Sequence, residues 1–339
     1  MKIFVRFVLL FVCLFYVASV SAQSPLRPLA PGVLKTIPPN VEYEDVFTRA
    51  DATEVLAALP KPPEELADDI LYDPEHWAKD VRFTRAVYCL EFSFKPLRIV
   101  PVDIPNKNGT MDKKLVWYMV YQVKNTGEAL QSKGTGDVKY PLEGGGKKLD
   151  LRNENTSFKS EKVELPVNFV PQFVLSSERV VVKSTTAIDP ETETLKTDIE
   201  EKKVAYVDRV IPLAIPVIMR REGFGDGEDN IPATTVNITK KELKPSDSAW
   251  GVAMWTDVDP KISKFSIFVS GLTNAYQWED QKLGEEGSYK EGAPLGTGRR
   301  MKRRILQLNW QHLGDEFDIS DKEIKFGWTG AVDYEWIYR

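Results

Sequence analysis

The stretch Trp250–Leu272 constrains the possible fold more than any other part of this chain. Its two apolar runs, Trp250–Trp255 and Phe265–Gly271, flank the polar segment Thr256–Lys264. Their aromatic and β-branched residues are typical of strands that are half or fully buried. Because a short segment with turn-forming residues separates them, the pattern predicts a hairpin at the centre of a β-rich core.

Other segments show the same strand character. Leu115–Val123 is apolar on both faces, which predicts a central strand covered on each side. Tyr88–Lys95 alternates with a period of two, and Leu97–Ile104 contains a proline that favours an edge position or a bulge. Further strands are expected at Val167–Leu175, Val180–Lys183, Arg304–Trp310, Ile324–Trp328 and Ala331–Tyr338.

The remaining segments predict little helix. Tyr206–Arg221 is continuously apolar and contains prolines, so we expect a strand followed by a short helix that begins near Pro216. Glu128–Glu161 and Thr185–Lys203 are polar and charged, which predicts long exposed loops. About ten strands joined by turns indicate a mainly β fold, an antiparallel β-sandwich with long loop insertions.

The N-terminal part predicts a targeting signal followed by a Pro-rich linker. Basic Lys2 and Arg6, an apolar run over Phe7–Val20 and a small residue at Ala22 predict a signal peptide over residues 1–22. An uncleaved anchor is the alternative; after cleavage no membrane span is expected. Residues 23–80 carry five prolines in their first part and then short helical patterns, so we expect a Pro-rich linker with short helices. The β-sandwich domain would span residues 81–339.

Charge and cysteine content bear on two properties, nucleic-acid binding and disulfide formation. Removal of Lys2 and Arg6 with the signal peptide leaves Lys+Arg 43 of 45, against Asp+Glu 50. This mild acidity gives no indication of nucleic-acid binding. Cleavage also removes Cys13 and leaves Cys89 without a partner for an internal disulfide. Because Cys89 lies in an apolar strand, we expect an inert, buried thiol.

One motif resembles a known class of module. The segment Trp117–Gly127 is an aromatic, apolar strand that closes on an Asn-x-Gly turn. It resembles the strand and turn of immunoglobulin-like modules in bacterial envelope proteins. The chain as a whole is similar to uncharacterised exported bacterial proteins that combine a signal peptide with such a β-body. The resemblance implies an immunoglobulin-like architecture and carries over no catalytic residue.

Signatures of catalysis are sparse. The chain has no G-x-S-x-G, P-loop or H-E-x-x-H motif, and its two histidines are His76 and His312. His312 follows a predicted strand, so we expect it in a surface turn. Asp257 and Asp259 most simply form a turn, but they can also be a glycosidase-like carboxylate pair. A secreted hydrolase would use them, or Glu279 with Asp280.

An acidic loop is a candidate calcium site, and calcium is the one cofactor that the sequence indicates. Asp226, Glu228 and Asp229 lie within Gly225–Asn230, an oxygen-rich setting of the kind that calcium prefers. The spacing differs from that of an EF-hand loop, and a solvated acidic loop has the same composition. Both interpretations stay open.

The C-terminal 90 residues hold 14 of the chain's 36 aromatic residues, which makes this region the candidate for a binding surface. Tyr276 and Trp278 are the pair expected to be exposed, where they could stack on sugar rings or fill an interface. The alternative is that the aromatic residues pack in the core. A cationic run could hold an anionic partner or protect a strand edge; its members are Arg299, Arg300, Lys302, Arg303 and Arg304.

These patterns predict an exported protein in the periplasm, at the cell surface or outside the cell. Its expected role is non-catalytic, either structural or in binding an envelope protein, an extracellular protein or a polysaccharide. A carbohydrate-binding module, possibly one that depends on calcium, is the first alternative. A secreted carboxylate-based hydrolase is the second.

Overall fold

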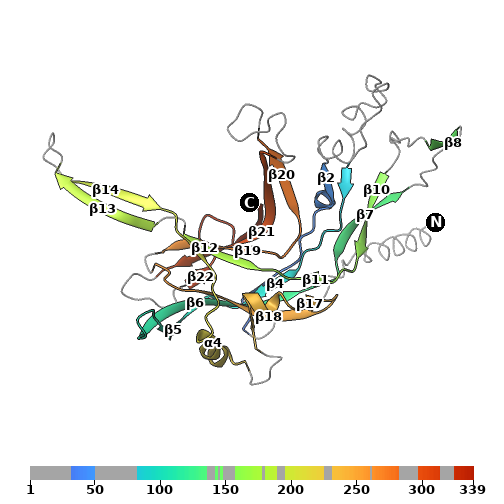
Figure 1. Ribbon diagram of the computed structural model, residues 1–339. Helices are drawn as coiled ribbons and strands as arrows, with labels where there is room; N and C mark the ends of the chain where they lie inside the picture. The colour runs from blue at the N-terminus through green and yellow to red at the C-terminus, as the bar shows by residue number, and fades with distance from the viewer. Residues whose placement is uncertain are drawn as a thin grey trace, which may run out of the picture. The chain divides into compact units, whose positions relative to one another are not determined.

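A computed structural model describes residues 32–49, 82–135, 142–143, 146–147, 157–177, 180–188, 195–224, 231–259, 262–281, 297–313 and 324–339. These residues form a mainly β structure with several antiparallel sheets (Figure 1). Val33–Arg339 belongs to one compact unit. Among the described helices, none is long and apolar enough to cross a bilayer.

The first large sheet has six strands in the order β1-β4-β6-β18-β16, with β5 also paired to β6. All of its pairs are antiparallel except β16 with β18. The bounds are β1 Lys35–Ile37, β4 Glu91–Phe94, β5 Arg98–Pro105, β6 Met111–Lys124, β16 Ala233–Thr234 and β18 Ser248–Trp255.

Strand β6 is the central strand that its sequence predicts. It pairs with β4 and β5 along one side and with β18 along the other. Trp117 and Tyr121 face one apolar core, whereas Val116 and Tyr118 face a second core on the opposite side of the sheet. Strand β5 pairs with β6 alone among the described strands, which confirms the edge position predicted from its proline.

The second large sheet has seven strands. Its order is β15-β12-β19-β21-β20, with β22 and β23 also paired to β21. The long strand β21 therefore holds four neighbours at different points along its length. The bounds are β12 Gln172–Ser177, β15 Ala205–Val207, β19 Lys264–Ser270, β20 Tyr276–Asp280, β21 Arg299–His312, β22 Ile324–Phe326 and β23 Tyr334–Tyr338.

Aromatic side chains from both sheets meet in one core. The ring centroids of Trp117 and Phe265 lie 5.8 Å apart, and their planes are nearly perpendicular. The rings of Tyr121 and Phe173 lie 4.7 Å apart. Each pair joins a strand of the six-stranded sheet to a strand of the seven-stranded sheet, so side chains of the two sheets pack on one another.

Helix α4 (Ala214–Glu222) covers the other face of the six-stranded sheet. Ala214 and Ile218 are buried against the β6 side chains Val116 and Tyr118. Glu222 accepts a hydrogen bond of 2.8 Å from the Tyr118 hydroxyl and is paired with nearby cations. Helix α4 confirms the short helix predicted near Pro216. The proline is tolerated because it lies in the first turn of the helix.

The predicted hairpin at Trp250–Leu272 is wrong, although both of its strands exist. Strand β18 pairs with β6 and β16, whereas β19 pairs with β12 and β21, so the two belong to different sheets. The connecting segment crosses between the sheets and buries Val258 and Ile262 in the shared core. A hairpin would have left these two side chains in a loop, so their burial favours the crossing.

Two segments expected to be loops contain paired strands. Within Thr185–Lys203, the end of β13 (Val180–Ile188) pairs with β14 (Leu195–Lys202). Within Glu128–Glu161, β7 (Ala129–Thr135) pairs with most of β10 (Ser157–Val163). An antiparallel ladder satisfies backbone groups without an apolar period, so polar composition did not reveal these ribbons.

Short elements complete the described structure. The segment Lys35–Val46, within the predicted N-terminal linker, contributes β1 to the six-stranded sheet and the 3-10 helix η1. Asn125 of the Asn-x-Gly turn accepts a 3.0 Å bond from the Gly127 N–H. The other elements are η1 Tyr43–Val46, β2 Phe47–Arg49, β3 Arg82–Thr84, β8 Leu142–Glu143, β9 Gly146–Lys147, β11 Val167–Asn168, α5 Thr235–Ile238 and β17 Glu242–Leu243.

Candidate functional site

The ribbon formed by β20 and the first half of β21 brings together the aromatic pair and the cationic run (Figure 1). In its register Tyr276 lies opposite Arg303 and Trp278 lies opposite Met301. Since side chains alternate between the faces of a strand, these four share one face with Arg299. We call this surface the aromatic-cationic face; it consists of Tyr276, Trp278, Arg299, Met301 and Arg303, and the register also places Asp280, opposite Arg299, on it.

Arginine side chains hold both rings of this face in place. The Arg299 guanidinium lies 3.6 Å from the ring centroid of Trp278. Arg85 lies 3.6 Å from the ring centroid of Tyr276, and its Nη2 donates a 2.9 Å bond to the Tyr276 carbonyl oxygen. Such cation–π contacts fix the ring planes, and both rings remain half-buried rather than enclosed.

The opposite face of the ribbon has a different character. Lys302 and Glu279 form an ion pair there, and Arg300 is exposed. The hydrogen bond and charge of Lys302 lower the pKa of the Glu279 carboxyl below its ordinary value. This face is a charge-paired surface, whereas the aromatic-cationic face combines rings, a methionine and arginines.

A cavity of about 490 Å³ adjoins the aromatic-cationic face. It lies beside the bend between β19 and β20, where the chain leaves the main sheet. Among the described residues that line it, two are arginines and none is acidic. The lining consists of Tyr88, Asn168, Val170, Pro171, Gln172, Ser270, Gly271, Thr273, Asn274, Ala275, Tyr276, Met301, Arg303 and Arg304.

Two residues shape the wall of the cavity. Gly271 has a φ of 91° and packs directly against the carbonyl group of Val170. Asn274 accepts a 3.0 Å bond from the Tyr88 N–H and donates a 2.9 Å bond to the Ala86 carbonyl oxygen. The bend is therefore held by backbone contacts on one side and by an amide side chain on the other.

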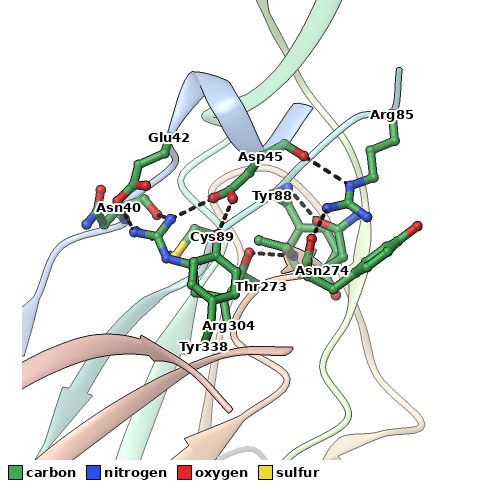
Figure 2. Close-up of polar contacts among 12 residues, drawn as sticks. Asn40, Glu42, Asp45, Arg85, Tyr88, Cys89, Thr273, Asn274, Arg304 and Tyr338 are labelled. Atoms are coloured by element: carbon green, nitrogen blue, oxygen red, sulfur yellow. Dashed lines mark hydrogen bonds and ion pairs between the residues drawn. The ribbon is translucent and has the colours of Figure 1, made fainter. Parts of the chain in front are cut away.

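Arg304, the last member of the cationic run, lies in a buried polar network (Figure 2). Its side chain is 3% exposed. Its Nη1 donates to Asp45 Oδ2 at 2.8 Å and to the Asn40 carbonyl oxygen at 3.1 Å, and its Nη2 pairs with Glu42. Its charge is neutralised inside the protein, so we assign Arg304 to the support of the site.

Asp45 connects this network to two other parts of the chain. The hydroxyl of Tyr338 in β23 donates to Asp45 Oδ1. Burial and the Asp45 carboxylate raise the pKa of Tyr338. Arg85, which holds the Tyr276 ring, donates from Nε to the Asp45 carbonyl oxygen at 3.1 Å. Asp45 therefore links η1, β23 and the arginine behind the aromatic ring.

Cys89 lies beside the network and is buried, as predicted. Its sulfur accepts a hydrogen bond from the Asn40 N–H at 3.4 Å. Burial raises the pKa of the thiol to about 12. Because the thiolate is the reactive form, this environment suppresses reaction at neutral pH.

A thiol titration checks this environment. We expect the native protein at pH 8 to react with a disulfide reagent far more slowly than the guanidinium-unfolded protein. With a pKa of about 12, only about one thiol in ten thousand would be ionised at that pH. Cys89 is the single cysteine after residue 22, so the signal reports one site. Rapid reaction of the native protein would contradict the buried environment.

Several predicted site residues lie elsewhere. Asp226, Glu228 and Asp229, the calcium candidates, lie outside the described residues, as does His76. Within the described part of the chain, no group of three or more His, Cys, Asp or Glu side chains is arranged to hold a metal ion.

In the connecting segment between β18 and β19, the Asp257 carboxylate makes a long-range ion pair and the Asp259 backbone makes a turn contact. Asp257 has a φ of 58° and pairs with Lys114 at 2.8 Å. The Lys114 hydrogen bond lowers the pKa of the Asp257 carboxyl. The Asp259 carbonyl oxygen accepts a 3.2 Å bond from the Ile262 N–H. The backbone contact of Asp259 is typical of a turn, whereas the Asp257 carboxylate ties the segment to β6.

The expected surface position of His312 is wrong. His312 is the last residue of β21, is 2% exposed and packs against the Trp117 ring with centroids 5.8 Å apart. The period of two that buries Leu308 and Trp310 continues to His312, so its ring faces the core. Its side chain belongs to the packing between the sheets.

The residues that sequence reasoning missed are those that complete the cavity. Met301 lies inside the cationic run and Asn274 just before the aromatic pair. Tyr88, which lines the cavity, and Arg85, which holds the Tyr276 ring, come from the segment between β3 and β4, far away in sequence. Fixed rings, amides and arginines form a surface suited to stacking and hydrogen bonding with a polar ring.

No protein-family model, curated protein or solved structure matches the chain.

Proposed function

We propose that the protein is an exported, non-catalytic binding protein that holds a polysaccharide on the aromatic-cationic face and in the adjoining cavity. The observation that carries this proposal is the register of β20 and β21. It aligns Tyr276 and Trp278 with Met301 and Arg303 on one face, and that face leads into a cavity. Export rests on the predicted signal peptide over residues 1–22.

The chemistry of the site supports a carbohydrate ligand. Sugar rings combine an apolar face with many hydroxyl groups, so they stack on aromatic rings and bond to amides. Tyr276 and Trp278 provide rings at neighbouring positions on one face of β20, and Asn168 and Gln172 add amides to the cavity. A volume of about 490 Å³ falls in the range of small-molecule sites and can take a few sugar units.

The pKa shifts of Asp257 and Glu279 argue against either residue as the general acid of a hydrolase. A general acid at neutral pH needs a carboxyl whose pKa is raised above its ordinary value. The pKa values of Asp257 and Glu279 are instead lowered, because Lys114 and Lys302 pair with them. Both carboxylates are therefore stabilised in the ionised form.

We also propose that the six-stranded and seven-stranded sheets form an antiparallel β-sandwich. The ring contacts of Trp117 with Phe265 and of Tyr121 with Phe173, which join the two sheets, support this arrangement. The immunoglobulin-like architecture remains an expectation from the resemblance of Trp117–Gly127.

Retention on insoluble and immobilised polysaccharides tests the function. We expect the protein to be retained by at least one glycan and Trp278→Ala to weaken retention about tenfold, because a stacking platform is lost. Trp328→Ala is the matched control, since Trp328 is also a half-buried tryptophan beneath a cation but lies away from the ribbon. Absence of retention on every glycan, or an equal loss in both variants, would contradict the proposal.

A chelator arm of the same experiment tests the predicted calcium loop. Retention that requires calcium would attribute part of the binding to Asp226, Glu228 and Asp229. Retention unchanged by chelator would leave the aromatic-cationic face as the complete site. Cell fractionation would test export independently of binding.

A further inference from the structure

We infer that the ligand of this cavity is an acidic polysaccharide, and that the Arg303 guanidinium binds the carboxylate of a uronic acid unit. This inference rests on the proposed function and narrows its ligand class. It depends on the balance of charge around the cavity, on the position of Arg303 opposite Tyr276, and on buried guanidinium donors beside the site.

The charge around the cavity is positive in excess. Arg304 and Arg85 lie beside Asp45 and Glu42, so this group of two cations and two carboxylates is balanced. Arg303 adds a positive charge at the cavity, where none of the described lining residues is acidic. An anionic group bound there meets no opposing carboxylate in that lining, and a low-dielectric wall strengthens the attraction.

The acidic residues of the ribbon lie away from this point. Glu279 is on the opposite face and is paired with Lys302. Asp280 is the register partner of Arg299 at the far end of the ribbon. Arg303 lies at the end of the ribbon next to the cavity, and Asp280 lies at the other end, so the two residues are separated along the ribbon.

The geometry of Arg303 suits a carboxylate next to a stacked sugar. Its backbone N–H and carbonyl both bond to Arg339, at 2.9 and 3.0 Å, which fixes its position on β21. Directly opposed residues of an antiparallel pair have Cβ atoms about 5 Å apart. A sugar ring against Tyr276 would therefore bring its carboxylate within reach of Arg303, whose planar guanidinium can donate two parallel bonds.

Two buried guanidinium nitrogens beside the cavity have hydrogen-bond donors that no described residue uses. Nε of Arg304 and Nη1 of Arg85 are buried, and neither has a hydrogen-bond partner within the described part of the chain. Arg304 is a lining residue of the cavity, and Arg85 lies over the ring of Tyr276. A buried N–H without a hydrogen bond favours an acceptor oxygen nearby, because leaving the donor unsatisfied is costly.

The test compares polygalacturonate with the same polymer after its carboxylates have been reduced to alcohols. We expect the protein to bind the acidic polymer at least tenfold more tightly at low salt. Arg303→Gln should remove about tenfold of the affinity for polygalacturonate and so abolish the preference for the acidic over the reduced polymer. Arg303→Lys should restore only part of the loss, because an ammonium cannot form the two parallel bonds.

Arg300→Gln is the matched control, because Arg300 lies on the same strand but on the opposite face. We expect its affinity for polygalacturonate to stay within twofold of the unsubstituted protein. Equal losses in the Arg303 and Arg300 variants would show diffuse charge attraction and would overturn the site. Slow Cys89 labelling in each variant confirms that the fold is retained.

The outcomes separate this inference from the function on which it rests. Equal binding of the acidic and reduced polymers would overturn the acidic ligand but keep polysaccharide binding. Failure to bind either polymer or any other glycan would overturn the proposed function itself. Tighter binding of a sulfated polymer than of polygalacturonate would overturn the carboxylate and assign the site to sulfate esters.

Discussion

Asp45→Ala is expected to lower the free energy of unfolding by about 3–5 kcal/mol, because it removes the buried carboxylate that is paired with the buried Arg304. The Arg304 and Asp45 side chains are 3% and 2% exposed, so water cannot replace the lost partner. The substitution also removes the acceptor of the Tyr338 hydroxyl. Urea unfolding followed by tryptophan fluorescence measures the change.

Glu42→Ala is the control for this prediction. Glu42 pairs with the same guanidinium but is 51% exposed, so its removal should cost about 1 kcal/mol or less. The double variant Asp45→Ala with Arg304→Met should be more stable than Asp45→Ala alone, since no buried guanidinium is left without its buried carboxylate. An Asp45→Ala effect no larger than that of Glu42→Ala would contradict the buried ion pair.

Gly271→Ala is expected to cost about 3–5 kcal/mol, from a strained backbone and from overpacking together. The φ of 91° at Gly271 is one that residues with a Cβ rarely adopt. The added Cβ would also overlap the Val170 carbonyl oxygen and lie 2.8 Å from its carbonyl carbon. Because both neighbours are backbone atoms, the clash cannot be relieved by a side-chain rotation.

Gly330→Ala separates these two causes. Gly330 has a φ of 92°, but a Cβ there would meet no atom within 4 Å. This control should therefore show the backbone strain alone, about 1–2 kcal/mol. The difference between the two variants measures the close approach at the cavity wall. Equal destabilisation by Gly271→Ala and Gly330→Ala would indicate that the bend at Gly271 opens to admit the Cβ, and that the cavity is wider than the structure shows.

The strands could be predicted well where apolar residues decide the local structure. The two-sided apolar run of β6 identified the central strand, and the prolines correctly placed β5 at an edge. The partners of β18 and β19 could not be read in the same way, since pairing depends on contacts far apart in sequence. Buried Val258 and Ile262 in the segment between them were the available signal that a hairpin was the wrong prediction.

The candidate site was predicted in its parts and not as a whole. Tyr276, Trp278 and the cationic run were each recognised from composition, but their alignment depends on the register of β20 with β21. The separate position of Arg304 could not be foreseen, because its partners Asp45 and Glu42 lie about 260 residues earlier. A residue's charge predicts that it needs a partner and does not predict which one.

The polar network around Asp45 also sets an order for folding. Asp45 and Tyr338 are separated by 293 positions, and Glu42 and Arg304 by 262. Contacts of such high sequence separation require the closure of very long loops, so they form late and slow the final step. We therefore expect the strands of the sheets to assemble before η1 docks. Until β23 is in place, Arg304 lacks the enclosure that β23 helps to provide, and the ribbon that carries the binding face stays loosely anchored at its base.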